Sequence, residues 1–204
     1  MTEFSYPNFR TQHGYMTKTA QTAYVATAMD SGLLPSDTML RADLVSLKAS
    51  NDLDVPIQFW QLFSVLGPDP IVAIVQSFYE RVFADEDWFT SVFARIGGVE
   101  HHTMTQASMW ADAMGGGPYY HGAEFRLSFH HTHNAMALMN DRGAARWVSL
   151  MVETLAASDH HMTDDPRVRI AINTFLTHFL RKYAVEFGLG NVGAFGEVNG
   201  TFIG

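Results

Sequence analysis

Residues 130–147, HHTHNAMALMNDRGAARW, form the most unusual stretch of the chain, and the rest of the sequence is interpreted around it. Three of its first four residues, His130, His131 and His133, are histidines. Neutral imidazole is the commonest side-chain metal ligand and the usual axial ligand of haem iron. Either these histidines are solvated at a helix end, where imidazolium is favoured, or one binds a metal or haem iron opposite His101 and His102.

Composition limits the kinds of site that the chain can build. The 204 residues are 47% hydrophobic and 13% aromatic, which excludes general disorder. No cysteine is present, so disulfides, thiolate zinc sites, iron–sulfur clusters and thioether-linked haem are excluded. Ten histidines is a high number for this length, and eight of them lie between residues 101 and 161. Any metal chemistry therefore depends on His, Asp, Glu or Tyr, and the histidines concentrate in one region.

Charge and hydropathy exclude two classes of partner. The formal charge is −8 and no Lys/Arg-rich face is evident, which argues against a nucleic-acid partner. No apolar run approaches the roughly 18 residues of a membrane span, and no basic segment followed by an apolar one opens the chain. We therefore expect a cytoplasmic protein without a membrane partner.

Apolar periodicity predicts an all-α protein of about seven helices, without strands. The clearest helix, residues 69–83, opens at Asp69-Pro70. The other predicted helices cover residues 57–66, 84–99 in short pieces, 100–114, 126–133, from 141 onward, and 165–187. The inward stripe of the clearest helix consists of Ile71, Ile74, Val75, Phe78, Tyr79 and Val82.

The helical pattern divides the chain into three parts. Polar residues and a proline at 49–56 separate a helical N-terminal extension, residues 1–56, from the main domain, residues 57–187. The extension contains two short amphipathic helices, at 18–30 and after Ser36, which we expect to pack on the core of the same chain or, less favoured, on a second subunit of a homodimer. Residues 188–204 read as a glycine-rich tail with no core role.

Polar side chains fall on the apolar faces of three predicted helices. Tyr79 is the polar member of its stripe, His102 and Gln106 lie one turn apart beside Met109, and Trp147 begins the stripe of its helix. A buried tyrosine usually bonds a nearby carbonyl, and a lone core histidine is usually satisfied by its neighbours. A histidine and a glutamine one turn apart are harder to assign to the core alone.

The order of these features resembles the truncated haemoglobins of the second group. The resemblance rests on FYERVFADEDWFTSVF at 78–93, a histidine-bearing helix ending in MGGGP at 114–118, and a histidine segment followed by ARWVSLM at 145–151. It covers roughly residues 57–187 and leaves the first 56 residues and the tail unmatched. It implies a truncated globin-like two-over-two helical sandwich around haem b (iron protoporphyrin IX), here with extra N-terminal helices.

The resemblance also implies a proximal iron ligand. In the family this histidine lies about eighteen residues after the first glycine that ends the distal helix, which leads from Gly115 to His133. Phe129 then occupies the apolar position one turn earlier, beneath the porphyrin. This chain departs from the pattern with three glycines before the proline and one extra residue between His133 and Trp147. His131, with Leu127 one turn before it, and His130 are therefore alternatives.

On the distal side, the resemblance assigns the residues that face the bound ligand. Tyr79 matches the tyrosine of the family's Phe–Tyr pair and Phe78 its neighbour, and Phe93 matches the aromatic residue that wedges the haem. His102 and Gln106 take the two distal-helix positions, where His102 could also coordinate iron as a sixth ligand. Trp147 matches the group's tryptophan, whose indole N–H can only donate. Such donors stabilise the charged form of bound dioxygen in a dry pocket.

Three hypotheses follow. The first is a haem protein that binds dioxygen and related diatomic ligands, with nitric oxide detoxification or peroxidase-type chemistry that an unidentified electron donor supports. The second is a globin-like sensor or interaction module, and the third is a non-haem metal site of His101, His102, His130 and His133. An ultraviolet–visible spectrum separates them: a Soret band indicates the first, featureless absorbance the second, and a bound metal without porphyrin the third.

Overall fold

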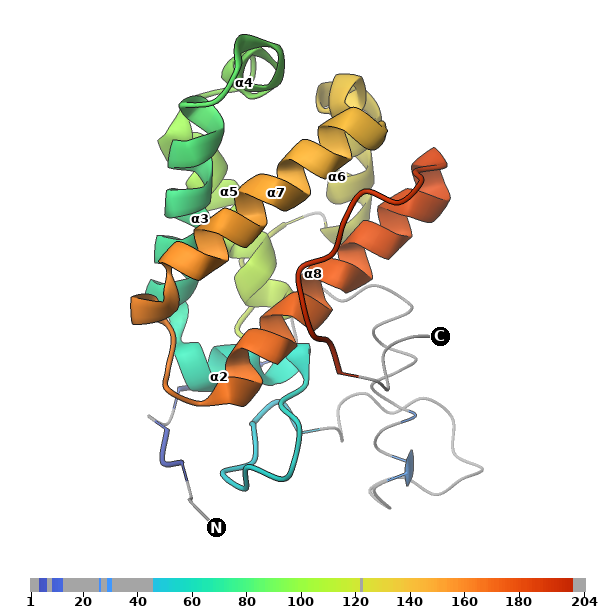
Figure 1. The fold of residues 1–204 in the computed structure, drawn as a ribbon. Helices are drawn as coiled ribbons and strands as arrows, with labels where there is room; N and C mark the ends of the chain where they lie inside the picture. Colours follow the sequence, from blue (N-terminus) through green and yellow to red (C-terminus); the bar gives the residue numbers. More distant parts are fainter. Residues whose placement is uncertain are drawn as a thin grey trace.

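The structure, a computed structural model, describes residues 4–6, 9–12, 26, 29–30, 46–121 and 123–199 (Figure 1). The helices expected at 18–30 and after Ser36 lie almost wholly outside the described residues. The helices of the main domain are α2 (Leu62–Leu66), α3 (Pro68–Phe83), α4 (Asp87–Ala94), α5 (Val99–Ala113), α6 (Ala123–Phe129), α7 (Asp141–Ala157) and α8 (Pro166–Phe187). No strand occurs in the described part of the chain, so the expected all-α class is confirmed.

Helix α3 packs along α5 on one side of the domain, and α7 and α8 run in opposite directions on the other side (Figure 1). This agrees with the two-over-two helical arrangement that the resemblance implies. The buried residues of α3 are the six of the predicted stripe. The helix begins one residue before the expected cap, at Pro68, because Gly67 has φ 66° and a proline at the first position needs no hydrogen-bond partner for its nitrogen.

The turn after α5 explains why three glycines precede the proline. Gly115 has φ 96°, and a Cβ there would lie 2.2 Å from the carbonyl oxygen of Trp60. A Cβ on Gly117 would lie 1.9 Å from the Asp112 carboxylate, which accepts hydrogen bonds from the backbone N–H groups of Tyr119 at 2.6 Å and Tyr120 at 2.8 Å. The glycines therefore let the chain reverse tightly against α2 and around a buried carboxylate.

The predicted start of α7 and the predicted start and end of α8 agree with the structure. Asn140 caps α7, and its side chain accepts a hydrogen bond from the N–H of Gly143. Asp165 caps α8, Pro166 occupies the first position, and Gly188 ends the helix in the left-handed conformation with φ 66°. Helix α6 starts at Ala123, three residues earlier than expected, and after Phe129 it continues as a π turn, His130–Asn134, and a 3₁₀ turn, Met136–Leu138.

The described residues of the N-terminal extension lie on the core of the main domain. The N–H of Phe4 donates to the carbonyl of Asn51, and the N–H of Gln12 donates to the carbonyl of Gly115. A Cβ at Gly67 would lie 2.5 Å from the Phe9 ring, so this ring covers the start of α3. These contacts agree with the favoured expectation for the extension. Packing on a second subunit stays a prediction for its remaining residues.

A buried ion pair links residues 50–55 to the start of α8. The guanidinium of Arg167 donates to both carboxylate oxygens of Asp165, from Nη2 at 2.6 Å and from Nε at 3.0 Å, and the side chains are 8% and 0% exposed. Its Nη1 donates to the carbonyl oxygens of Ser50 at 3.1 Å and Val55 at 2.8 Å. The Tyr6 hydroxyl donates to the same carboxylate. This one charged pair thus connects the segment around Tyr6, residues 50–55 and the start of α8.

The expectation that the tail has no core role is wrong. Val192 and Phe195 belong to the hydrophobic core, with 7% and 3% of their surface exposed. The tail turns at Gly188 and runs back between α7 and α8 (Figure 1). Its glycines permit close approach to the helices: a Cβ at Gly196, where φ is 122°, would lie 2.9 Å from the Asn173 amide nitrogen. At Gly196, the absence of a side chain thus permits tight packing against α8.

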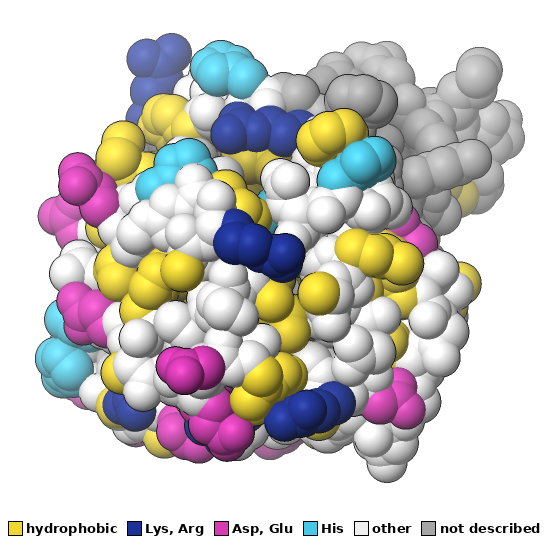
Figure 2. All heavy atoms as spheres, turned by 90° about the horizontal axis from the view of Figure 1, so that it is seen from above, with side chains coloured by type: hydrophobic (Ala, Val, Ile, Leu, Met, Phe, Trp, Pro, Cys, Tyr) yellow, Lys and Arg dark blue, Asp and Glu magenta, His cyan; other side chains and the backbone are white. Residues whose placement is uncertain are grey.

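The molecular surface carries interspersed charge on the face seen in Figure 2, where acidic, basic and histidine side chains alternate over the described residues without a single basic patch. Large exposed apolar side chains include Met104, Met136 and Val185, at 66%, 53% and 87% exposure. Among the described helices, none alone is long and apolar enough to cross a membrane. Only the bent pair Phe59–Leu66 and Pro68–Phe83 passes that test of length and composition together.

Replacing Arg167 with Met should strongly destabilise the fold, because the Asp165 carboxylate would stay buried without its counter-charge. Removing one partner of a buried pair costs about 3–5 kcal/mol of unfolding free energy. Urea denaturation followed by circular dichroism measures it. The matched control is Arg81→Met, whose pair with Glu153 spans 3.9 Å between side chains 39% and 52% exposed, and which should change little. Equal losses in the two variants would contradict the structural role of Arg167.

Candidate functional site

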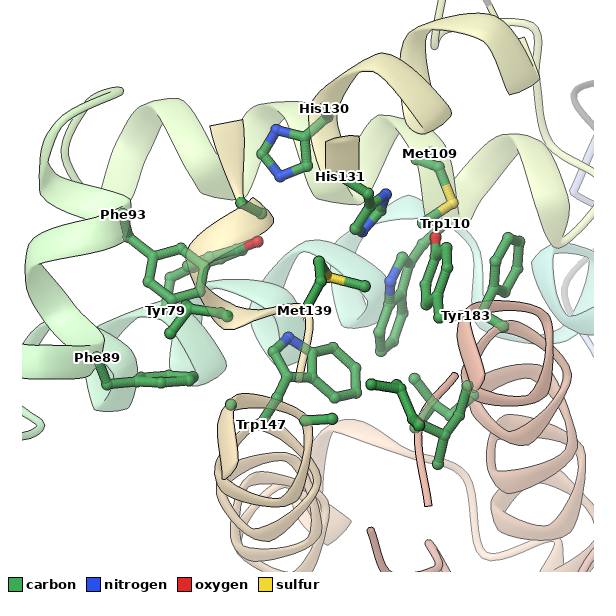
Figure 3. A pocket seen from close by; sticks show the side chains of 18 of the residues that line it. Tyr79, Phe89, Phe93, Met109, Trp110, His130, His131, Met139, Trp147 and Tyr183 are labelled. Atoms are coloured by element: carbon green, nitrogen blue, oxygen red, sulfur yellow. The ribbon is translucent and has the colours of Figure 1, made fainter. Parts of the chain in front are cut away.

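A cavity of about 120 Å³ lies between α3, α4 and α5 on one side and the α6–α7 segment, α7 and α8 on the other. Its wall is mainly apolar and aromatic. Figure 3 shows Tyr79, Phe89 and Phe93 at one end, Met109, Trp110 and Tyr183 at the other, and Met139 and Trp147 between them. The lining residues with a polar group are Tyr79, Trp110, His130, His131, Trp147 and Tyr183. An apolar pocket with a few convergent polar groups is the usual form of a cofactor site.

Of the residues predicted for the site, the structure brings five to this pocket: Tyr79, Phe93, His130, His131 and Trp147. The other predicted residues, Phe78, His102, Gln106, Phe129 and His133, do not line it. Met139 and Leu189, both on irregular segments, are lining residues that sequence reasoning missed. Neither belongs to a helical stripe, so no periodic signal could have identified them.

His131 is placed as a metal ligand would be. Its Nδ1 donates to the carbonyl oxygen of Leu127 at 2.8 Å, one helical turn earlier, and Leu127 is only 4% exposed. A carbonyl can only accept, so Nδ1 carries the proton and the lone pair is left on Nε2, the nitrogen that a metal needs. Burial, and then the neighbouring His130, lower the pKa of His131 to about 4. The ring is therefore neutral at physiological pH.

His130 is the second histidine on the pocket wall. It is half-buried, its ring lies 5.1 Å from that of His131 at 81°, and burial lowers its pKa. Figure 3 shows both rings entering the pocket region from the same side. His130 is thus neutral and lines the pocket. No hydrogen bond to a carbonyl that would fix its tautomer is found in the described part of the chain.

The structure places His133 away from the pocket. Its Nδ1 lies 3.1 Å from the carbonyl of Phe129, its ring stacks on the Phe129 ring at 4.1 Å, and Phe129 is 49% exposed. His131 lies four residues after the buried Leu127, whereas His133 lies four residues after the exposed Phe129, so the two histidines are on opposite faces of the segment. The segment continues as a π turn, in which the N–H of Ala135 bonds the carbonyl of His130 at 3.0 Å.

His102 is buried but turned toward the backbone. Its Nε2 donates to the carbonyl oxygen of Phe93 at 3.0 Å, and its ring stacks on Tyr79 with centroids 5.0 Å apart. Burial lowers its pKa. Because Nε2 holds the proton for that bond, it has no free lone pair in this arrangement. Gln106, one turn later, is half-buried and does not line the pocket. The sequence predicted that both residues face the pocket, and in the structure neither lines it.

Tyr79 and Trp147 are two of the hydrogen-bond donors at the pocket. Tyr79 is 6% exposed, and no hydrogen bond of its hydroxyl is found in the described part of the chain. Burial raises the pKa of Tyr79, so the hydroxyl stays protonated. The Trp147 ring packs against Phe78 at 5.1 Å, and Figure 3 shows its indole nitrogen and the Tyr79 hydroxyl directed into the pocket. Buried tyrosines usually have a partner, so this free donor points to a ligand.

A bidentate ion pair fixes the helix that carries Trp147. The Arg146 guanidinium donates to the two carboxylate oxygens of Asp85 at 2.7 and 2.5 Å. Asp85 follows the end of α3, and its side chain is 4% exposed, against 34% for Arg146. The pair therefore holds α7 against the α3–α4 corner. This corner is next to the part of the pocket where Tyr79 and Trp147 lie, which we call the donor end.

Residues 61–181, more than half of the chain, match the family model of the bacterial-like globins. The chain belongs to this family. Comparisons with curated proteins and with solved structures gave no match. Membership confirms the truncated globin expected from the sequence and makes this a haem-binding globin by family. Assignment to the second group stays a prediction.

The residues present in this globin fit a haem. A mainly apolar and aromatic pocket, a neutral histidine with its proton on Nδ1, and two donors without a hydrogen-bond partner among the described residues suit a porphyrin and an iron-bound ligand. The alternative non-haem site does not fit: among the described residues, no group of three or more His, Asp or Glu is arranged to hold a metal ion. His101, His102, His130 and His133 therefore do not form the metal site that was considered.

Asp85→Asn should lower stability at neutral pH and lose its effect in acid. Hydrogen bonds from Arg146 lower the pKa of Asp85 despite its burial, so the pair's contribution is present above the carboxylate's unfolded pKa of about 3.9 and disappears as pH falls through the lower folded pKa. We expect about 1 kcal/mol at pH 7, because Arg146 is partly solvated. Urea denaturation of the apoprotein at pH 7 and at pH 2.5 measures it.

The control for this prediction is Glu153→Gln, which removes an exposed pairing with Arg81 and should change stability little at either pH. A loss from Asp85→Asn that is as large at pH 2.5 as at pH 7 would show that the charge on Asp85 is not what matters.

Proposed function

We propose that this globin holds haem b (iron protoporphyrin IX) in the pocket, with His131 as the proximal ligand, and binds dioxygen or a related diatomic ligand beside Tyr79 and Trp147. One observation carries the proposal: a neutral His131, oriented by the Leu127 carbonyl, shares an apolar pocket with a buried tyrosine hydroxyl that has no partner among the described residues. A core histidine and a core tyrosine without a ligand to serve would more commonly bond each other or the backbone.

The choice of proximal histidine follows from orientation. His131 and His133 both bond a carbonyl one turn earlier, but only His131 reaches the pocket, and its preceding turn residue Leu127 is buried where Phe129 is exposed. His130 reaches the pocket without such a bond in the described residues. His131 has both properties, so it replaces His133 as the preferred ligand and His130 is the runner-up.

The residues of the donor end determine what ligand chemistry is favoured. Ferrous haem gives bound dioxygen partial negative charge. The Tyr79 hydroxyl and the Trp147 indole N–H can each donate to such a ligand in a pocket that Phe89 and Phe93 keep apolar. Two donors in a dry pocket favour slow release of a polar ligand over simple transport. They are equally suited to nitric oxide or peroxide chemistry supported by an external electron donor.

His102 acts in this proposal as a positioning residue. By donating to the Phe93 carbonyl and stacking on Tyr79, it holds the two aromatic rings that border the ligand. It is not assigned as an iron ligand, because its Nε2 proton is committed to the backbone. Gln106 lies outside the pocket wall and is not assigned a contact with the ligand.

Titrating the apoprotein with hemin tests the function and the ligand together. The wild type should develop a Soret band, His131→Gly should not bind hemin tightly, and added imidazole should restore binding by filling the space of the missing ring. His130→Ala and His133→Ala should retain the band. No Soret band in the wild type would refute the haem proposal. Loss of the band in His133→Ala with retention in His131→Gly would refute the choice of ligand.

Tyr79→Phe, which deletes only the hydroxyl, should speed dioxygen dissociation about 10- to 100-fold. A hydrogen bond to a charged acceptor contributes roughly 1.5–3 kcal/mol, and about 1.4 kcal/mol corresponds to a factor of ten. The dissociation rate of carbon monoxide, which is less polar when bound, should change little. Trp147 could take over the bond, so the double variant with Trp147→Phe is measured as well. Unchanged stopped-flow rates in both variants would remove these residues from the ligand site.

A further inference from the structure

The tail, residues 188–199, is anchored along its whole path by specific contacts. The N–H of Gly190 donates to the Asp141 carboxylate at 2.8 Å, at the start of α7. Farther along, the Asn173 amide donates to the carbonyl of Glu197 at 3.0 Å, and the N–H of Asn199 donates to the Thr174 hydroxyl at 2.9 Å. The tail therefore joins α7 to α8 by bonds to both helices.

Two tail residues reach the site itself. Leu189 lines the pocket, next to residues of α7 and α8. Phe195 is 3% exposed and packs edge-on against the Trp147 ring, with centroids 6.0 Å apart and planes at 88°. Phe78 lies against Trp147 at 5.1 Å. The half-buried indole is thus held by a core residue of α3 and by a residue of the tail, both of which limit its rotamers.

We propose that the tail is a working part of the haem pocket, in which Phe195 positions the Trp147 indole and Leu189 completes the wall between α7 and α8. The inference rests on the proposed haem function and goes beyond it, because the family match ends at residue 181 and leaves the tail outside. Without Phe195, the indole gains freedom, its N–H loses a fixed direction, and the pocket opens between α7 and α8.

The test uses the full chain reconstituted with hemin and two measurements: haem transfer to excess apomyoglobin, followed by absorbance, and dioxygen dissociation by stopped flow. Phe195→Ala should raise both rates about tenfold, and Phe195→Leu, which retains apolar volume and protects folding, should raise them less. Val185→Ala removes apolar surface from a side chain that is 87% exposed on α8 and should leave both rates unchanged. Urea denaturation of each apoprotein records general stability.

A double-mutant cycle separates positioning from general stability. If Phe195 acts through the indole, Phe195→Ala should change dioxygen dissociation little in a Trp147→Phe background. The inference would be overturned if Phe195→Ala changed the dioxygen dissociation rate by the same factor in both backgrounds, or if neither Phe195→Ala nor Phe195→Leu changed the two rates. In either case, a Soret band in the wild type would leave the haem function standing. A wild type without a Soret band would instead refute the proposed function on which the inference rests.

Discussion

The buried carboxylate of Asp112 holds the turn that joins α5, in one wall of the pocket, to the segment leading to α6 and His131. Its two oxygens accept the N–H groups of Tyr119 and Tyr120, and Gly117 packs so closely that a Cβ would collide with it. A buried charge needs such bonds to be tolerated. Together with Gly115 against the backbone of Trp60, in the 3₁₀ turn Phe59–Gln61 before α2, this turn reverses the chain after α5.

After this turn, the face on which α6 packs decides which histidine reaches the pocket. Leu127 is buried and Phe129 is exposed, and each precedes a histidine by four residues. His131 therefore lies inward with its Nδ1 on the Leu127 carbonyl, and His133 lies outward on the Phe129 ring, within the π turn His130–Asn134. Single π turns are common at functional sites, and this one orients a candidate iron ligand.

The segments outside the family match are part of the same structure. The N-terminal extension contributes Phe9 over Gly67 and the Tyr6 hydroxyl on the Asp165 carboxylate, while the tail contributes Leu189 and Phe195 to the pocket and to its tryptophan. Segments from both ends of the chain therefore pack on the core of the globin domain.

The sequence by itself determined the all-α class, most of the helices and the inner face of α3. The stripe of α3 with Tyr79, the cap at Asp165 and the stop at Gly188 follow from local periodicity and capping, which depend on neighbours within a few residues. Only the tertiary structure decided that His131 rather than His133 meets the pocket, that His102 turns to the Phe93 carbonyl, and that Phe195 lies on Trp147. Each of these is set by packing between different segments of the chain, which helical spacing does not encode.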